Sequence, residues 1–254
     1  MRIFLASLDA LPELTDLTWP RLAAPLAPHR AQKALAMARE GDRRRALLAG
    51  LALRMVLGVA ADGDLAFGPD GKPFLAKGGP EFSLSHSGGH VALSVGGPAH
   101  GLDVQELRDK AVPESLARWA LCPEELALLA QNPDPALFTR LWAMKEAYVK
   151  ATGRGLSGGF GHFSALPPAP GPRTVEGRSV WFYLADLPGA TLALACLGPS
   201  FPPSILSLDG RLRRWAESLP GQDPDPGPPL YRPPGRPKRS GPDWDFGANP
   251  GVGL

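Results

Sequence analysis

The chain has 254 residues and a formal net charge of +2; 44% of its residues are hydrophobic, 30 are glycine and 30 are proline. A chain this apolar can bury a sizeable core, which excludes disorder over its whole length. Two cysteines are too few for a disulfide framework, and no apolar run reaches the roughly 18 residues of a membrane span. We therefore expect a cytoplasmic globular protein that does not enter a membrane.

The first hundred residues alternate between helical and strand patterns. Leu47, Leu51 and Met55 repeat at helical spacing and Gly58 is a typical C-terminal stop, which predicts a helix over 43–57. Another helix is expected over 28–41. Alternating apolar residues separated by turn residues predict strands at 3–5, 65–67, 73–75, 82–85, 91–95 and 101–105.

Helical patterns return after residue 112. The best-marked helix begins after Asp134, a typical N-cap, with Pro135 in the first helical position, and it ends at Gly153. The same reasoning predicts helices at 113–120, 123–130 and 209–218, and strands at 180–184 and 190–197.

The order of these elements indicates an α+β fold with antiparallel sheets, because the helices come in blocks instead of alternating with single strands. Residues 191–195 are similar in character to 91–95, which indicates two similar halves over 1–100 and 101–218. Residues 219–254 carry ten prolines and little apolar periodicity. They predict a disordered, Pro/Gly-rich tail.

Positive charge is concentrated in one segment. Between Arg30 and Gly58, seven basic and two acidic residues give a charge of +5, which leaves −3 for the rest of the chain. Such a patch indicates an anionic ligand or partner, although a solvated helix face explains it equally well. A nucleic-acid-binding module is disfavoured, because no aromatic residues are interleaved with the arginines.

Carboxylates that can hold a hard metal ion occur on a strand and on a helix. Asp103 and Gln105 are two residues apart on a predicted strand, so their side chains share one face. Glu146 and Lys150 lie one turn apart on the 134–153 helix, whose other residues are mostly apolar. Charged groups on a mostly buried helix tend to be paired, liganded or functional.

The turn around Ser85 and His86 offers hydrogen-bond donors for a phosphate, as does Lys72 on a glycine–proline turn. A serine hydrolase is disfavoured, because a strand and not a helix follows Ser87. His86 and His90 lie on a turn and a strand, so they do not form the helical pair of a zinc protease. An ordinary polar turn is the competing interpretation.

Four strings taken together resemble the 4′-phosphopantetheinyl transferases of the surfactin (Sfp) type. In chain order they are Gly71-Lys72-Pro73, Phe82-Ser83-Leu84-Ser85-His86-Ser87-Gly88, Gly101-Leu102-Asp103-Val104 and Leu141-Trp142-Ala143-Met144-Lys145-Glu146-Ala147-Tyr148-Val149-Lys150. The stretch from Trp142 to Lys150 is the most specific. The likeness extends from about Pro28 to Leu197.

The resemblance implies an enzyme that transfers the phosphopantetheine arm of coenzyme A to a serine of an acyl or peptidyl carrier protein. The by-product is 3′,5′-ADP, and Mg²⁺ is required, with Mn²⁺ as a substitute. It further implies a monomer with two similar α+β halves, a pseudodimer, and a coenzyme A cleft between them. No nucleic acid or membrane partner is expected.

The resemblance also implies roles for individual residues. Asp103, Gln105 and Glu146 match the metal positions. The resemblance implies that Glu146, or a water held by the Mg²⁺, takes the proton of the carrier serine. Lys150 matches the lysine at the leaving phosphate, and Glu125 matches a further catalytic acid near the metal or the base. The positions that bind coenzyme A hold Arg30, Lys33, Arg45, Lys72, Ser85, His86, Asp103 and Lys150.

Gln105 departs from the family pattern, because many relatives have glutamate there. Glu106 follows it but points to the opposite face of a regular strand, so it does not substitute. The departure leaves the preference between Mg²⁺ and Mn²⁺ open. It also leaves open a second interpretation, a catalytically inactive protein that binds coenzyme A or a carrier protein.

Overall fold

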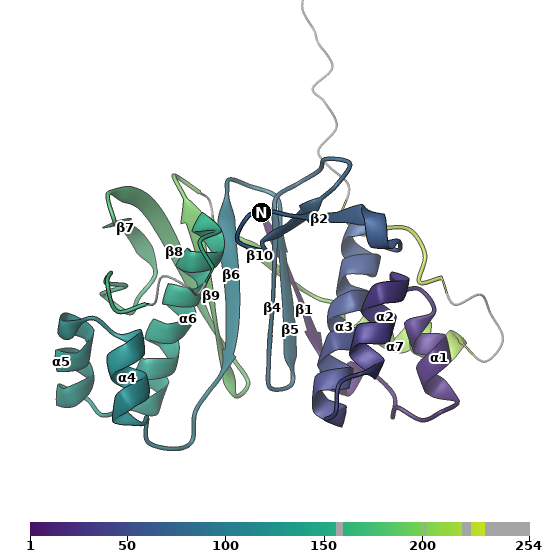
Figure 1. Ribbon diagram of the computed structural model, residues 1–254, viewed down its shortest axis with the longest axis horizontal. Helices are drawn as coiled ribbons and strands as arrows, with labels where there is room; N and C mark the ends of the chain where they lie inside the picture. Colours follow the sequence, from purple (N-terminus) through teal and green to yellow (C-terminus); the bar gives the residue numbers. More distant parts are fainter. Residues whose placement is uncertain (156–159, 201, 220–224, 232–254) are drawn as a thin grey trace, which may run out of the picture.

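The computed structural model describes residues 1–155, 160–200, 202–219 and 225–231. Within these residues the chain forms two four-stranded sheets and a two-stranded hairpin, with helices around them. Figure 1 shows the two large sheets in the middle of the molecule, with one group of helices on each outer side. The α+β class predicted from the sequence is therefore confirmed at this level.

The N-terminal sheet has the strand order β10-β1-β5-β4. Its strands are β1 (Arg2–Ser7), β4 (Phe82–Ser87), β5 (His90–Val95) and β10 (Ser204–Ser207). The helices on its outer side are α1 (Thr18–Ala23), α2 (Pro28–Leu35), α3 (Glu40–Leu57) and α7 (Asp209–Ser218). The small hairpin joins β2 (Leu65–Phe67) to β3 (Pro73–Leu75), and short 3-10 turns occur at η1 (Leu8–Ala10) and η2 (Asp62–Asp64).

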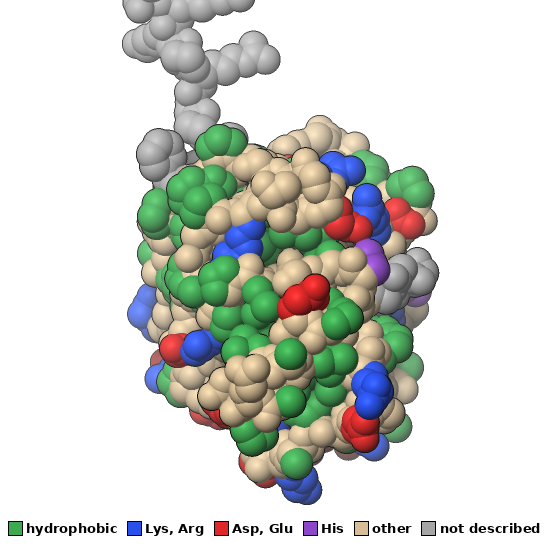
Figure 2. Space-filling model, turned by 90° about the vertical axis from the view of Figure 1, so that its left-hand side faces the viewer, with side chains coloured by type: hydrophobic (Ala, Val, Ile, Leu, Met, Phe, Trp, Pro, Cys, Tyr) green, Lys and Arg blue, Asp and Glu red, His purple; other side chains and the backbone are tan. Residues whose placement is uncertain are grey.

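The C-terminal sheet has the strand order β6-β9-β8-β7 and is antiparallel throughout. Its strands are β6 (His100–Glu106), β7 (Gly171–Val175), β8 (Arg178–Leu187) and β9 (Ala190–Leu197). Its helices are α4 (Glu114–Ala120), α5 (Pro123–Gln131) and α6 (Pro135–Thr152). Figure 2 views their outer face, where hydrophobic side chains lie between charged ones.

The two sheets share a common order. In the N-terminal sheet, β1 pairs with β5, the second strand of the β4–β5 hairpin. In the C-terminal sheet, β6 pairs in the same way with β9, the second strand of the β8–β9 hairpin. The common orders are β1-β5-β4 and β6-β9-β8. The stretches 91–95 and 191–195, which look alike in sequence, lie in β5 and β9, the corresponding strands. The two stretches therefore occupy corresponding places in the strand orders of the two sheets.

Three apolar clusters hold the layers together. One joins α3 and α7 to the N-terminal sheet, and another joins α6 to the C-terminal sheet. The third lies between the sheets, where Ile3 and Ala92 meet Leu102, Val104 and their neighbours on β9. Residues along β6 thus alternate between a face that packs on the other sheet and a face that packs on α6.

Local signals fix the ends of the two long helices. The side chain of Asp134 accepts a hydrogen bond from the Ala136 N–H at 2.8 Å, and Gly153 ends α6 with φ of 72°. Gly58 ends α3 in the same way, with φ of 79°. The helix expected over 28–41 is shorter than predicted, since α2 ends at Leu35 and α3 begins at Glu40.

Gly101 allows α6 to lie directly against β6. A Cβ atom at this position would come within 2.1 Å of the Ala147 carbonyl oxygen and 2.3 Å of the Ala151 nitrogen, which are backbone atoms of the helix. Only glycine permits so close an approach. This close approach places the last turns of α6 over one face of β6, the face whose side chains point toward the helix.

The expected boundaries of the two halves differ from the structure in the segment 204–218, which was assigned to the C-terminal half. β10 pairs in parallel with β1, and Leu208, Leu212 and Trp215 are buried in the N-terminal cluster. The chain therefore returns to its first sheet after completing the second. The strands β7 and β10 and the helix α1 were not predicted.

The prediction of a disordered tail beginning at residue 219 also differs from the structure for 225–231. The N–H groups of Leu230 and Tyr231 donate to the carbonyls of Met55 and Val56, at 2.9 and 3.0 Å, so this segment contacts the end of α3. The remainder of the predicted tail, 220–224 and 232–254, lies outside the described residues.

No helix in the described part of the chain is long and apolar enough to span a bilayer. Cys122 and Cys196 are buried and form no disulfide.

Candidate active site

The centre of the candidate site is a contact between the two sheets and α6. Lys150, on α6, lies with its Nζ 2.7 Å from Asp103 Oδ1 on β6 and 3.1 Å from the Ser85 hydroxyl on β4. Ser85 donates in turn to Asp103 Oδ1 at 2.7 Å. Asp103 is 5% exposed and Lys150 is 30% exposed, so the pair is partly shielded from water.

The chemistry of the cluster fits a hard metal ion. Asp103 Oδ2 is buried and has no hydrogen-bond partner among the described residues, although its other oxygen has two. Burial raises the pKa of Glu146, the charge of Lys150 opposes this shift, and the charge of Asp103 adds to it. Two neighbouring carboxylates, one with an unpartnered buried oxygen, are a donor set that Mg²⁺ accepts together with phosphate and water oxygens.

Gln105 lies two residues beyond Asp103 on β6, opposite Thr191 of β9, and is partly exposed. Its amide oxygen adds a neutral donor on the Asp103 face. Within the described residues there is no cluster of three His, Cys, Asp or Glu side chains that could hold a metal. Any metal held here therefore depends on the two acids, Gln105 and ligands that arrive with the substrate.

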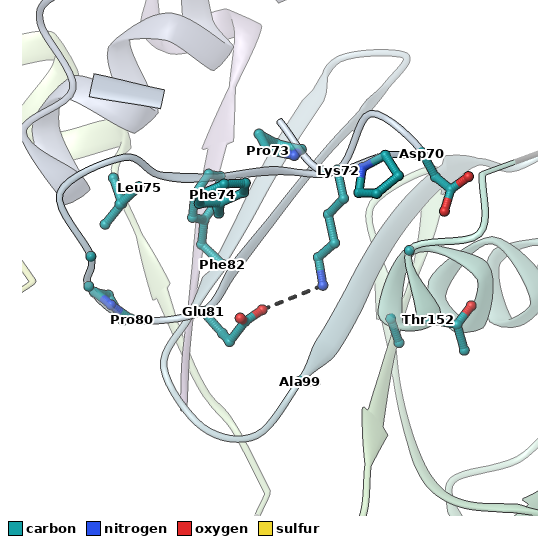
Figure 3. Close-up of a pocket in the computed structure, with 16 residues that line it drawn as sticks. Asp70, Lys72, Pro73, Phe74, Leu75, Pro80, Glu81, Phe82, Ala99 and Thr152 are labelled. Atoms are coloured by element: carbon teal, nitrogen blue, oxygen red, sulfur yellow. Dashed lines mark hydrogen bonds and ion pairs between the residues drawn. The ribbon is translucent and has the colours of Figure 1, made fainter. Parts of the chain in front are cut away.

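A pocket of about 260 Å³ collects three of the residues predicted from the sequence. Lys72, Glu146 and Lys150 line it together, and the glycine turn at Gly71 forms part of its rim. Lys72 also lines an adjoining cavity of about 460 Å³ between the β2–β3 loop and the end of α6. Figure 3 shows the Lys72 side chain extending from this loop toward Glu81, 3.5 Å away; its Nζ also donates to the His100 carbonyl at 3.0 Å.

His86 and Arg45 mark a second positive region beside Lys150. Partial burial lowers the pKa of His86, and the charges of Arg45 and Lys150 lower it further, while Asp103 acts in the opposite direction. Arg45 donates to the Gly88 carbonyl at 3.1 Å and pairs with Asp42. A histidine whose pKa is lowered by burial and by neighbouring cations gains a proton more readily when a ligand brings negative charge.

Arg30 and Lys33 on α2 are not brought into this cluster. Arg30 lines a separate cavity with Asp62 and Phe67, and burial lowers its pKa. Lys33 is exposed and has no hydrogen bond or ion pair with the residues that the structure describes. Their predicted contacts with coenzyme A remain predictions.

Glu125 differs from the expectation that it acts beside the metal. It is fully buried and forms an ion pair with Lys145 at 2.7 Å. Its oxygens also accept hydrogen bonds from the N–H groups of Cys122 and Ala165, at 3.0 and 2.7 Å. These partners hold Glu125 inside the core of the C-terminal half. It stabilises the fold there and is not among the residues that line the pocket.

Sequence reasoning missed the role of Lys145, which lies next to Glu146 in the most specific string. Its Nζ donates to the carbonyls of Phe160 and Phe163, at 2.7 and 2.6 Å, and its side chain is fully buried. Adjacent residues on a helix point about 100° apart, so Lys145 and Glu146 face different surroundings. The apolar neighbours at Ala143, Met144 and Ala147 were the available signal.

Two further arginines of the basic segment bind the protein's own backbone. Arg44 donates to the carbonyls of Leu8, Leu11 and Pro12, at 3.1 to 3.2 Å, and Arg43 donates to that of Met37 at 3.3 Å. Part of the +5 charge therefore serves the fold rather than a ligand.

A family model described as the 4′-phosphopantetheinyl transferase superfamily matches residues 99–195, from β6 to β9. The 4′-phosphopantetheinyl transferase AcpT of Escherichia coli O157:H7 is 36% identical over 136 residues, which cover 52% of this chain and 67% of AcpT. The chain belongs to the 4′-phosphopantetheinyl transferase superfamily.

Other members of this superfamily match over different lengths. The 4′-phosphopantetheinyl transferase Sfp of Bacillus subtilis strain 168 is 27% identical over 71% of this chain and 86% of Sfp. A putative 4′-phosphopantetheinyl transferase of Synechocystis is 37% identical over 48% of this chain, and the matched stretch spans only 54% of that relative. The phosphopantetheinyl transferase family predicted from the four strings is thus confirmed.

Proposed function

We propose that this protein is an Sfp-type 4′-phosphopantetheinyl transferase. It transfers the phosphopantetheine arm of coenzyme A to a serine of an acyl or peptidyl carrier protein and releases 3′,5′-ADP. The observation that carries the proposal is the contact between Lys150 and Asp103, beside Glu146 and at the edge of the pocket that Lys72 lines. We further propose that it acts as a cytoplasmic monomer.

Coenzyme A is proposed to bind where the positive side chains gather. Lys72 and Lys150 line the 260 Å³ pocket, and His86 and Arg45 lie beside it, so a diphosphate and a separate phosphate have cationic partners on different sides. We propose that this pocket belongs to a cleft between two related halves. The common strand order β1-β5-β4 and β6-β9-β8 supports that interpretation.

Asp103, Glu146 and Gln105 are proposed to hold Mg²⁺ or Mn²⁺. The unpartnered oxygen of Asp103 and the raised pKa of Glu146 support an ion here, because a cation would compensate both. When bound, the ion neutralises charge on the diphosphate and orients it.

The protein's own residues are proposed to move the proton and stabilise the leaving group. The serine oxygen of the carrier forms a bond to the β-phosphorus of coenzyme A, and the bond from that phosphorus to the 3′,5′-ADP oxygen breaks. Glu146, which lines the pocket, takes the serine proton with its carboxylate. Lys150 has three N–H donors, of which Asp103 and Ser85 engage two, so one remains for the leaving phosphate.

Release of 3′,5′-ADP tests this function. The protein, coenzyme A, an apo carrier protein and Mg²⁺ are expected to give 3′,5′-ADP in amounts equal to the carrier modified, and omission of the carrier or addition of EDTA is expected to stop its release. Coenzyme A binding without 3′,5′-ADP release would contradict the proposal and identify an inactive binding protein.

A further inference from the structure

Two edge strands meet where the N-terminal and C-terminal sheets approach each other. β4 is an edge strand of the first sheet, and β6 is an edge strand of the second. The two strands are not paired with each other by backbone hydrogen bonds. Instead, the hydroxyls of Ser83, Ser85 and Ser87 accept hydrogen bonds from the N–H groups of β6. The distances are 3.0 Å from Leu102, 3.2 Å from Val104 and 3.0 Å from Glu106.

This serine seam, formed by Ser83, Ser85 and Ser87, follows from strand geometry. Every second side chain of β4 points to the same face, and every second N–H of β6 points away from β9. The serine hydroxyls therefore satisfy donors that an edge strand would otherwise leave unpaired. His86 follows Ser85 directly along β4, so the two side chains point to opposite faces of the strand.

Ser85 differs from the other two serines in its further contacts. It donates its single O–H to Asp103 Oδ1 at 2.7 Å, and it accepts from Lys150 Nζ at 3.1 Å as well as from the Val104 N–H. A hydroxyl has one donor and two acceptor positions, and these three bonds use all of them. Among the described residues, Ser87 makes no such contact with Asp103 or Lys150.

The contacts of Ser85 affect the orientation of the Asp103 carboxylate. One oxygen of this carboxylate is held by Ser85 and Lys150, and the other is buried and has no partner in the described part of the chain. A carboxylate fixed in this way presents one defined oxygen. Ser85 belongs to the N-terminal sheet, whereas Asp103 and Lys150 belong to the C-terminal half, so the orientation depends on the seam between them.

We propose that Ser85 is a positioning residue, which orients Asp103 and Lys150 across the serine seam, and that it does not bind a phosphate of coenzyme A. The inference rests on the proposed transferase function for its kinetic consequences. It reassigns Ser85, which the sequence analysis places among the residues that bind coenzyme A.

Ser85→Ala and Ser87→Ala form a matched pair, because each loses one hydroxyl that serves a backbone N–H of β6. Both variants are expected to lower the urea midpoint of unfolding, Ser85→Ala more than Ser87→Ala, because Ser85 is buried and also loses its bonds to Asp103 and Lys150. Only Ser85→Ala is expected to lower kcat, by about 10- to 100-fold, as loss of a hydrogen-bond partner of a metal ligand does. The KM for coenzyme A should stay within about twofold, because a falling kcat at constant KM indicates loss of transition-state stabilisation rather than of ground-state binding.

A binding measurement accompanies the kinetics. Mn²⁺ titrated into the protein with coenzyme A present, and followed by electron paramagnetic resonance, is expected to bind about 10-fold more weakly to Ser85→Ala than to Ser87→Ala. If Ser85→Ala does not fold, Ser85→Cys, which has nearly the same volume but is a poor hydrogen-bond donor, is expected to show the same pattern.

Two results would overturn the assignment. A higher KM for coenzyme A with unchanged kcat would mean that Ser85 binds the cofactor. Equal kcat and equal Mn²⁺ affinity in the two alanine variants would mean that Ser85 serves only the seam. An inactive wild-type protein would contradict the proposed function instead, and the Mn²⁺ titration would then still decide the role of Ser85.

Discussion

Lys150 joins the parts of the candidate site. Its Nζ lies 2.7 Å from Asp103 Oδ1 and 3.1 Å from the Ser85 hydroxyl, and its side chain lines the pocket together with Glu146. The burial of Glu146 works against its ionisation, and the charge of Lys150 works in favour of it. Asp103 and Glu146 therefore lie beside Lys150 before any substrate phosphate enters, and Lys72 lines the same pocket.

Glu146→Gln removes the proposed proton acceptor while keeping the size of the side chain. We expect kcat to fall by about 10²- to 10⁴-fold, the range typical of a general base, with the KM for the carrier protein little changed. Intact-mass measurement of the carrier over time gives the rate. A variant that folds normally and turns over at a near-wild-type rate would show that another group accepts the proton.

His86 should take up a proton when coenzyme A binds. Partial burial and the charges of Arg45 and Lys150 lower its pKa in the free protein, and a bound phosphate would raise it again. Between those two pKa values the complex holds more protons than the free protein, so affinity should rise as pH falls through this range. Calorimetry in two buffers with different ionisation heats measures the uptake.

The matched variants for this measurement are His86→Gln and His90→Gln. His90 lies at the start of β5, and its Nε2 contacts the Pro188 carbonyl at 2.9 Å. Proton uptake is expected to disappear in the first variant and to persist in the second. Equal uptake in both would place the phosphate elsewhere.

The residues of the site were predictable to different degrees. Asp103, Glu146 and Lys150 stood out because charged groups occur in otherwise apolar elements. The position of Ser85 could not be predicted, since it depends on which face of β4 meets β6. That relation arises only when the two sheets pack together.

At the scale of elements, α6 serves two purposes on two faces. Lys145 points into the core with Glu125, and Glu146 points into the pocket. Because Lys145 also binds the carbonyls of Phe160 and Phe163, the ion pair fastens the segment 160–165 to α5 and α6. The buried pair thus stabilises the element that presents the site.

Glu125→Gln should therefore affect stability more than chemistry. It leaves the Lys145 ammonium buried without its counter-ion, and breaking a buried pair in this way costs about 3–5 kcal/mol in the free energy of unfolding. Urea unfolding followed by circular dichroism measures the loss. Glu124→Gln, at the exposed neighbouring position, is the control and should be close to wild type.

The outcome separates two roles for Glu125. Wild-type stability together with a large loss of kcat would contradict the structural role and support the catalytic one that the family resemblance implies.

Most elements could be predicted because their signals are local. The caps at Asp134 and Gly153 and the alternation in β5 and β9 are visible in the sequence. β10 could not be predicted, since its four residues are exposed and it forms only by pairing with β1, some two hundred residues earlier in the chain. β7 begins at Gly171-Pro172, which in sequence indicates a turn.

In the whole molecule, two C-terminal segments of the chain return to the N-terminal half. β10 and α7 return to the N-terminal sheet, and residues 225–231 then reach the end of α3. There the N–H groups of Leu230 and Tyr231 satisfy helix-terminal carbonyls, and Asp225 pairs with Arg54 at 2.5 Å. The segment acts as a strap on α3.

A chain that ends at Ser218 should consequently be less stable than one that ends at Tyr231. Loss of two backbone hydrogen bonds, each contributing about 0.5–1.5 kcal/mol, predicts a difference of about 1–3 kcal/mol in the free energy of unfolding. Thermal or urea unfolding of the two shortened proteins measures it. Equal stability would show that 225–231 can be removed without cost.

The activity proposed for this protein is transfer of phosphopantetheine to a carrier protein. Intact-mass spectrometry tests it most directly, with the full chain, coenzyme A, Mg²⁺ and a panel of apo carrier proteins from fatty-acid, polyketide and nonribosomal-peptide pathways. We expect at least one carrier to gain the mass of one phosphopantetheine group, and its serine-to-alanine variant to gain none. No mass gain on any carrier, with a folded protein that binds coenzyme A, would contradict the claim.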